Sequence, residues 1–529
     1  MNANRQTLYA PMEELLVSGG DARATIDAAT GLNRFGCTPR PRPEALSLGS
    51  STASSISKRA FCHVEAERAR FLELSSHNNV LEEQTERMRH ELKHLLGLSE
   101  MAVEIVFSPS GTDSTLHALF LARVLSGATP LDTLLLASDE TGSGVPDALS
   151  GRHFSTMTAA GVTVTKGEPI AGLAEDVTRI SLPMRNGQGA LRPPACIDQE
   201  VLDTLSQSVA RGHNVLLQVM DSSKLGGRCP SVDCLRVIQS QFADSVRIVV
   251  DACQMRISLA RLHWHLDQGH MVLISGSKFF TGPPFSGALL APEALSHPIA
   301  ERQRIPSGLQ SYTGRSDWPQ DWKHIRAALP DRANFGQYFR WTAALDEMRT
   351  YFAVPLDFRR AVLQKFAEIA TEAICSRYPH ALLMEEGDSS SDDIEDAEMV
   401  DRTIFPLLLR QGRHWISFEA STKLYQALNQ NSIASLPACL SRHERALASK
   451  LCHVGQPVRV PCGDREETGV LRICASARTV SEVWSRYRRE PFALNMEQER
   501  NDLATLLQKI ELLSRYSLSI PERAACRHS

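Results

Sequence analysis

One lysine stands between small residues in the segment ISGSKFFTGPPFSGALL (residues 274–290), at the end of the apolar run HMVLISGSK. Glycine and serine beside Lys278 leave room for a ligand to approach its amine closely. Asp251 ends an earlier apolar run, VRIVVD. Further upstream, SPSGTDS (residues 108–114) lies between an expected strand and an expected helix, where backbone N–H groups and the helix dipole favour a phosphate. Each pattern alone has an ordinary explanation, such as a helix cap or a surface lysine, but their order along one domain points to a shared site.

These three patterns fit a single cofactor. Open α/β sheets bind ligands at the carboxyl ends of their strands, where such residues gather. A ligand with a phosphate, a ring nitrogen that needs a carboxylate and an aldehyde that needs an amine matches all three, and pyridoxal 5′-phosphate (PLP) is such a ligand. We expect Lys278 to form the Schiff base, Asp251 to keep the pyridine nitrogen protonated, and Gly111 and Thr112 to contact the phosphate.

Strand and helix patterns alternate from about residue 70 onward. The apolar runs VEIVFS, DTLLLAS, GVTVTKG, NVLLQVMD, RIVVDACQ, MVLISGSK and FSGALLAP are expected strands, and segments such as SVDCLRVIQSQFAD and ISLARLHWHLDQG are expected helices between them. Continuous apolar strands separated by helices indicate a mostly parallel sheet that is buried on both faces. The predicted fold class is therefore α/β, with a large sheet domain of the seven-stranded type.

The sequence pattern divides the chain into three parts. Residues 1–60 are rich in Pro, Arg and Ser and are expected to form an N-terminal arm, and residues 61–325 form the large α/β domain. Residues 326–529 combine long helical patterns with separate strands, as in a smaller α+β domain. The acidic, serine-rich run at 385–401 is expected to be a solvated loop.

Composition excludes several classes of function. A net charge of −4 gives no electrostatic case for nucleic acid or for an anionic membrane, and no apolar run is long enough to span a bilayer. The first residues lack the pattern of a secretory signal. Because the 12 cysteines form no CxxC pairs and have no matching histidine spacing, we predict neither a metal site nor a disulfide framework, and we expect a cytoplasmic location.

The segments VVDACQMR and ISGSKFFTGPPFSGALL resemble the class V aminotransferases and cysteine desulfurases, which are PLP-dependent enzymes of fold type I. The resemblance implies a PLP-transferase type I fold, with Lys278 as the Schiff-base lysine and Asp251 as the partner of the pyridine nitrogen. It also implies that Gln254 binds the ring hydroxyl and that Ser275 contacts the phosphate. The family usually has His or Gln directly before the lysine, whereas this chain has Ser277, whose hydroxyl is expected to keep the phosphate contact.

Other matches to this family are looser. Thr141, in SDETGSG, takes the place of a histidine that stacks on the cofactor ring, and His153 is a second candidate for stacking. Ser223, in VMDSSKLGG, falls where the family contacts the cofactor. The segment GLQSYTGR (residues 308–315) resembles the part by which a neighbouring subunit completes the phosphate site, which implies a homodimer.

The substrate end of the predicted site rests on Arg472, in GVLRICAS, which resembles the family's arginine clamp for a substrate carboxylate. In the arm, residues 49–51 are expected either to line the substrate site or to form a surface turn. Cys462 and Cys452 precede Arg472 at distances that resemble the position of the desulfurase nucleophile, but the residues around them do not match that loop.

Three functions stay open at this point. The preferred hypothesis is a PLP-dependent enzyme that transfers an amino group from an amino acid. The second is a cysteine desulfurase or a lyase that breaks a bond at Cβ. The third is a non-catalytic interaction protein that keeps the same fold.

Overall fold

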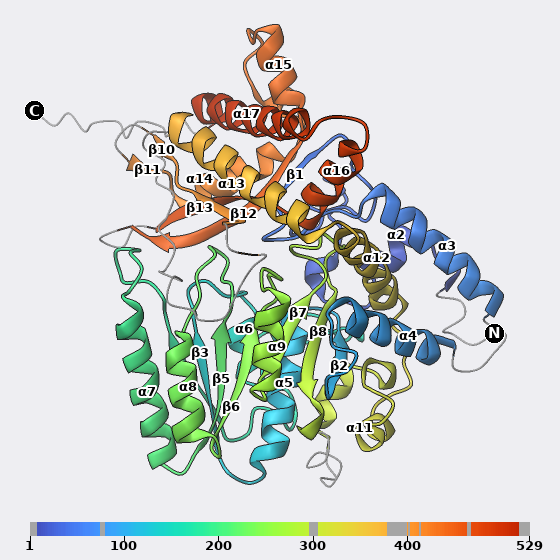
Figure 1. The fold of residues 1–529 in the computed structure, drawn as a ribbon, viewed down its shortest axis with the longest axis vertical. Helices are drawn as coiled ribbons and strands as arrows, with labels where there is room; N and C mark the ends of the chain where they lie inside the picture. Colours follow the sequence, from blue (N-terminus) through green and yellow to red (C-terminus); the bar gives the residue numbers. More distant parts are fainter. Residues whose placement is uncertain are drawn as a thin grey trace, which may run out of the picture.

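The computed structural model describes residues 8–74, 80–295, 305–377, 399, 402–411, 414–462 and 467–517. Its largest element is a seven-stranded sheet with the order β2-β8-β7-β6-β5-β3-β4 (Figure 1). The strand β8 is antiparallel to both of its neighbours, and the other pairings in this sheet are parallel. The strands are β2 (Val103–Ser108), β3 (Leu131–Leu136), β4 (Val177–Leu182), β5 (Asn214–Met220), β6 (Val246–Asp251), β7 (Met271–Ser275) and β8 (Gly287–Pro292).

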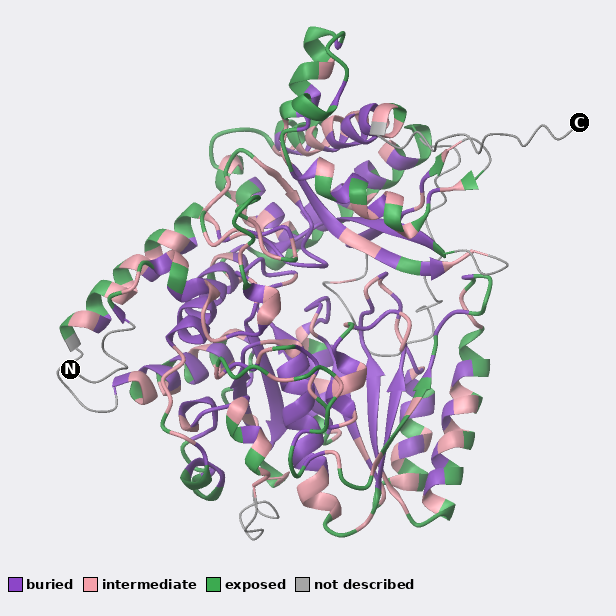
Figure 2. Ribbon diagram, turned by 180° about the vertical axis from the view of Figure 1, so that it is seen from behind, coloured by how far each residue is buried: buried purple, intermediate pink, exposed green. Residues whose placement is uncertain are grey.

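Helices cover both faces of this sheet, so its side chains divide between two apolar cores (Figure 2). Along β7, Val272 and Ile274 enter one core, and Met271 and Leu273 enter the other. Such continuous burial explains why the central strands appear in the sequence as unbroken apolar runs. The helices of this region are α3 (Lys58–Leu74), α4 (Val80–Leu95), α5 (Gly111–Ser126), α6 (Val145–Leu149), α7 (Pro194–Ala210), α8 (Val232–Phe242), α9 (Leu259–Asp267), α11 (Lys323–Ala328) and α12 (Phe335–Phe352).

Serine residues fix where three of these helices begin. Ser110, Ser231 and Ser258 precede α5, α8 and α9, and each hydroxyl accepts a hydrogen bond from the backbone N–H three residues later. A serine cap of this kind satisfies one of the otherwise unpaired N–H groups of the first turn. The start of α5 is therefore defined by local sequence, and it lies at the same edge of the sheet as the ends of β6 and β7 (Figure 1).

The smaller domain contains a four-stranded sheet with the order β1-β12-β13-β9. The strand β1 comes from the N-terminal arm and pairs in parallel with β12, so the arm is an integral part of this domain. Its strands are β1 (Leu46–Leu48), β9 (Ile404–Leu407), β12 (Cys452–Pro461) and β13 (Glu467–Cys474), with a separate hairpin of β10 (Arg410–Gln411) and β11 (His414–Trp415). Its helices are α13 (Leu356–Arg377), α14 (Phe418–Leu428), α15 (Arg442–Ser449), α16 (Ala477–Tyr487) and α17 (Phe492–Ser517).

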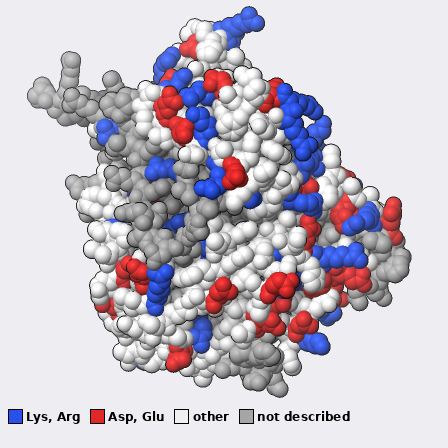
Figure 3. All heavy atoms as spheres, viewed as in Figure 1, with Lys and Arg blue, Asp and Glu red and all other residues white. Residues whose placement is uncertain are grey.

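Short elements complete the described chain. They are the helix α2 (Met12–Val17) and the 3₁₀ turns η1 (Ala22–Ala24), η2 (Glu293–Leu295), η3 (Ser307–Ser311), η4 (Arg315–Asp317) and η5 (Ile433–Ser435). The acidic run at 385–401 lies outside the described residues apart from Met399. Lys and Arg side chains are interspersed with Asp and Glu on the face shown in Figure 3. None of the helices within the described ranges is both long and apolar enough to cross a lipid bilayer.

One expected strand of the large domain is wrong. The run GVTVTKG at 161–167 forms no strand of the sheet, because Gly161 and Gly167 both have positive φ and Val162 is exposed. The edge position belongs instead to β4, in which polar and apolar residues are mixed. An edge strand is only partly covered, so it lacks the continuous apolar run that marks its neighbours.

Candidate active site

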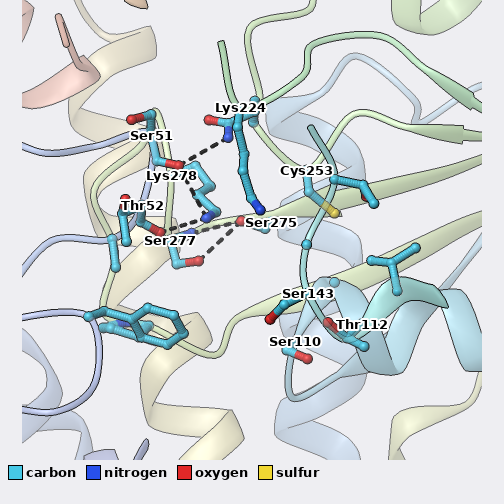
Figure 4. A pocket seen from close by; sticks show the side chains of 18 of the residues that line it. Ser51, Thr52, Ser110, Thr112, Ser143, Lys224, Cys253, Ser275, Ser277 and Lys278 are labelled. Atoms are coloured by element: carbon cyan, nitrogen blue, oxygen red, sulfur yellow. Dashed lines mark hydrogen bonds between the residues drawn. The ribbon is translucent and has the colours of Figure 1, made fainter. Parts of the chain in front are cut away.

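Lys278 follows β7 and reaches a cavity of about 220 Å³ at the carboxyl edge of the large sheet, beneath the arm and the smaller domain. Its Nζ donates hydrogen bonds to the carbonyl oxygens of Thr52 (2.6 Å) and Ser51 (3.3 Å) (Figure 4). Burial, followed by the nearby Arg472 guanidinium, lowers the pKa of Lys278 to about 7. Gly276 permits this placement, because a Cβ there would lie 2.4 Å from the Cβ of Ala344 on α12. The lysine is therefore held by backbone oxygens and is partly neutral near pH 7.

Asp251 ends β6 and lines the same cavity. Its Oδ1 accepts a hydrogen bond from the Cys253 backbone N–H (3.1 Å), and its Oδ2 accepts one from Gln218 Nε2 (3.3 Å). Burial raises the pKa of Asp251 above its usual value. Gln254 also lines the cavity, with its Nε2 donating to the Ser51 carbonyl at 3.0 Å. The structure thus brings the predicted lysine, carboxylate and amide together.

The start of α5 forms one wall of the cavity. Figure 4 shows Ser110 and Thr112 there, across the cavity from Ser275 and Ser277, whose hydroxyl oxygens lie 3.1 Å apart. Gly111 is needed for close packing, because a Cβ at this position would lie 2.5 Å from Cys253 Sγ. The Ser110 hydroxyl donates to the Asp113 carboxylate, so the donors suited to an anion are the free N–H groups of the first helical turn and the hydroxyls of Ser275 and Ser277.

Thr141 lines the cavity at the position predicted to stack on a ring. It is 6% exposed, and its Oγ1 has no hydrogen-bond partner in the part of the chain that the structure describes. Burying a hydroxyl without a partner costs free energy, so a bound ligand that hydrogen-bonds to it would remove this penalty. This orphaned hydroxyl, the tight glycine at the start of α5 and the facing amine and carboxylate all fit a ligand with the polar groups of PLP.

Two predicted site residues do not line the cavity. His153 Nδ1 lies 2.6 Å from the Tyr312 hydroxyl, and the two rings stack, so the histidine is engaged elsewhere. Ser223 donates to the Glu140 carboxylate and accepts from the backbone N–H groups of Gly227 and Leu225. Its role is to hold a turn, and the residues on either side of it, Ser222 and Lys224, line the cavity instead.

Arg472, on β13, forms the opposite wall of the cavity and is 2% exposed. Its guanidinium donates to the carbonyl of Gln456 (2.7 Å) and the hydroxyl of Thr52 (2.8 Å). Burial lowers the pKa of Arg472 to about 10. Among the described residues it makes no ion pair with a carboxylate, so the cavity contains a buried cation that lacks an anionic partner. Its Nη1 also donates to the carbonyl oxygens of Ser51 and Lys224 at 3.3 Å, and a carboxylate bound here would replace one of these longer contacts with a charge-assisted one.

The N-terminal arm contributes cavity residues that the sequence pattern did not reveal. Arg23, Arg34 and Phe35 line the cavity together with Thr52, whereas of the predicted residues 49–51 only Ser51 does. Arg23 forms an ion pair with Asp21 at 2.5 Å, and its Nη2 lies 3.4 Å from Ser110 Oγ at the start of α5. Only the tertiary contact between the arm and α5 places this charge at the site.

Three further predicted segments lie away from the cavity. The segment at 308–315 does not line the cavity of its own chain, and its Tyr312 and Thr313 hydroxyls bond within that chain. Cys452 is buried at the start of β12, and Cys462 directly follows the end of that strand. Neither of these cysteines lines the cavity.

A scan against protein-family models and a search of curated proteins found no match. Solved structures match over most of the chain. A NifS-like protein is 12% identical, with a TM-score of 0.52 over 89% of this chain and 100% of that one. Ureidoglycine-glyoxylate aminotransferase from Bacillus subtilis is 12% identical, with a TM-score of 0.49 over 92% of this chain and 96% of its own. The cysteine desulfurase CsdA from Escherichia coli is 14% identical, with a TM-score of 0.49 over 89% and 95%.

At such low identity these likenesses concern the fold. The predicted seven-stranded, mostly parallel sheet is confirmed by the strand order and by the similarity to the NifS-like protein. The chain therefore has the fold of the fold-type-I PLP-dependent enzymes, as the resemblance of its sequence implies.

Proposed function

We propose that this protein is a PLP-dependent enzyme that acts on an amino acid, and that its reaction is the transfer of an amino group. One observation carries the proposal. A lysine amine, a buried carboxylate and the start of a helix face one cavity, whose opposite wall contains an arginine that pairs with no carboxylate in the described part of the chain. The non-catalytic hypothesis gives no reason for these four groups to converge.

The chain's own residues would hold the cofactor as follows. Lys278 would attach it, Asp251 would face the pyridine nitrogen, and the start of α5 with Ser275 and Ser277 would bind the phosphate. When bound, PLP supplies an aldehyde for the amine and an electron-poor ring that acidifies the Cα–H of an amino acid. Thr141 would donate its buried hydroxyl to the ligand.

Lys278 is also placed to move a proton. The Lys278 amine would be free again once the substrate amine has taken its place on the cofactor, and a pKa of about 7 would leave it partly neutral at physiological pH, so Nζ would accept the proton that leaves the substrate Cα. The carbonyl oxygens of Ser51 and Thr52 limit where Nζ can move. Arg472 orients the substrate by binding its carboxylate, which fixes the Cα–H bond relative to the lysine.

The position of the cysteines favours amino transfer over desulfuration. A persulfide-forming cysteine must reach the substrate as a thiolate. Among the described residues that line the cavity, Cys253 is the one cysteine. Burial and the adjacent Asp251 raise its pKa well above the usual value, so it stays a thiol.

The decisive experiment is a single turnover without an amino acceptor. PLP-loaded protein is mixed with a panel of amino acids, and the keto acid, ammonia and sulfide that are released are measured. Amino transfer yields a single equivalent of keto acid per site, and an added keto acid restores the starting absorbance. Ammonia or sulfide release over many turnovers would instead establish the lyase or desulfurase alternative, and loss of sulfide release in Cys462→Ser would identify its nucleophile. A Lys278→Ala control should release nothing.

A further inference from the structure

A second lysine enters the cavity from the turn after β5. Figure 4 shows the Lys224 side chain extending into the cavity. Within the described part of the chain, its Nζ forms no hydrogen bond and no ion pair. Burial, followed by the charge of Arg472, lowers the pKa of Lys224 to about 8, and the charges of Glu140 and Asp251 offset part of this effect. The side chain is thus a half-buried cation that makes no ion pair with any carboxylate of the described residues.

The carboxylates around the cavity are already engaged by other groups. Glu140 pairs with Arg185 at 2.5 Å and also accepts the Ser223 hydroxyl. Asp251 would face the pyridine nitrogen of the proposed cofactor, and Lys278 would be attached to the cofactor when the substrate arrives. Lys224 and Arg472 remain as neighbouring cations of the cavity wall, in addition to Arg34 from the arm.

Arg472 contacts the backbone of Lys224, so the two cations lie close together. Arg472 Nη1 donates to the carbonyl oxygen of Lys224 at 3.3 Å, so both side chains enter the cavity from adjoining parts of its wall. A substrate with a single carboxylate would satisfy Arg472 and would leave Lys224 unpaired. A half-buried charge without a partner is unfavourable, and a second anionic group on the substrate removes that cost.

We propose that the substrate is an amino acid with a second anionic group on a short side chain, and that Lys224 binds this group while Arg472 binds the α-carboxylate. This inference rests on the proposed function, because it assigns Asp251 and Lys278 to the cofactor. It makes Lys224 the residue that determines substrate specificity.

Unreactive acids test the proposal without relying on catalysis. Succinate and butyrate have the same number of carbons but carry two carboxylates and one, and calorimetry on the PLP-loaded protein measures their dissociation constants. Succinate should bind more tightly than butyrate. Lys224→Met should raise the dissociation constant of succinate by about 10- to 100-fold and should not change that of butyrate, as expected for the loss of a charge-assisted contact. Lys224→Arg should restore much of the affinity for succinate. Lys423→Met, an exposed lysine of α14, is the matched control for net charge.

A set of amino acids with different side-chain anions identifies which anionic group Lys224 prefers. Aspartate, cysteate and O-phosphoserine present a carboxylate, a sulfonate and a phosphate, and asparagine is the uncharged analogue of aspartate. Cofactor absorbance reports their binding. Tight binding of any of the three that depends on Lys224 supports the inference. Equal affinity for aspartate and asparagine would overturn this inference, and so would an equal loss of affinity for succinate and butyrate in Lys224→Met. Either result would leave the proposed function standing. If no amino acid changes the absorbance and PLP does not attach to Lys278, the proposed function fails, and this inference fails with it.

Discussion

Lys278 is held by two backbone carbonyls in a largely desolvated position, and this controls when its amine can react. Only the neutral amine attacks an aldehyde, and with a pKa of about 7 the neutral form is lost below pH 7 and predominates above it. The rate of PLP attachment to the apo-protein should therefore rise between about pH 6 and 8, whereas an ordinary lysine reacts in this way near pH 10. Absorbance measures the rate, and borohydride reduction followed by peptide mapping locates the adduct. A rise only above pH 9, or an adduct on another lysine, would contradict the assignment.

The proposed role of Asp251 depends on its negative charge, and replacement by an amide of the same size tests that charge while it keeps most of the contacts. Asp251→Asn retains an oxygen that accepts the Cys253 N–H bond, so the local fold should persist. A neutral amide cannot keep a pyridine nitrogen protonated, and turnover should fall by about 100- to 1,000-fold, the usual scale for a lost electrostatic contact to the reacting group. PLP should still bind, as measured by titration. Unchanged turnover would show that the carboxylate is only structural.

Arg23 places a guanidinium beside the start of α5, where the phosphate is proposed to bind. If it helps to bind the phosphate, Arg23→Gln should raise the dissociation constant of PLP by about 10-fold, the scale of one charge-assisted hydrogen bond. Pyridoxal, which lacks the phosphate, should bind the variant and the parent protein equally. Arg23→Lys should recover part of the difference. An equal loss for both aldehydes would mean that Arg23 only supports the arm through its pair with Asp21.

At the scale of secondary-structure elements, the position of α5 depends on close packing of β8 against the residue that precedes the helix. A Cβ on Gly287 would lie 2.4 Å from the backbone carbon of Ser110, directly before α5. Gly287→Ala must therefore displace the start of α5, and we expect a loss of about 1–3 kcal/mol in the free energy of unfolding, with weaker PLP binding. Urea denaturation and cofactor titration measure the two effects. Gly187→Ala is the control, because the space around that glycine is open. An equal free energy of unfolding in the two variants would show that the backbone between β8 and α5 can shift without loss of stability.

At the scale of the whole molecule, the homodimer stays a prediction. Sedimentation should give a mass of twice 58.4 kDa. If the segment at 308–315 completes a neighbouring phosphate site, cofactor binding is coupled to association, and the dissociation constant of PLP should rise when the protein is diluted. A monomer with the same affinity for PLP at all protein concentrations would remove the neighbouring subunit from the site. In that case the phosphate would be bound by residues of a single chain, including Arg23.

The sequence by itself determined the central strands of the sheet and the residues at their carboxyl ends. Central parallel strands are buried on both faces, so they appear as continuous apolar runs, and the polar residues that end them, Asp251 and Lys278, stand out. Serine caps likewise mark the start of α5 in the local sequence. These features depend on neighbours along the chain, which is why they could be predicted.

Other features were decided only by the tertiary structure. The edge strand β4 and the arm strand β1 have weak local patterns and are fixed by their pairing partners. Lys224 looked ordinary beside Ser223, yet the fold turns Lys224 toward the cavity and engages Ser223 with Glu140. Arg23 meets α5 across 87 residues of chain. Such contacts depend on long-range packing, which imposes no periodicity on the residues that make them, so the sequence carries no local signal for them.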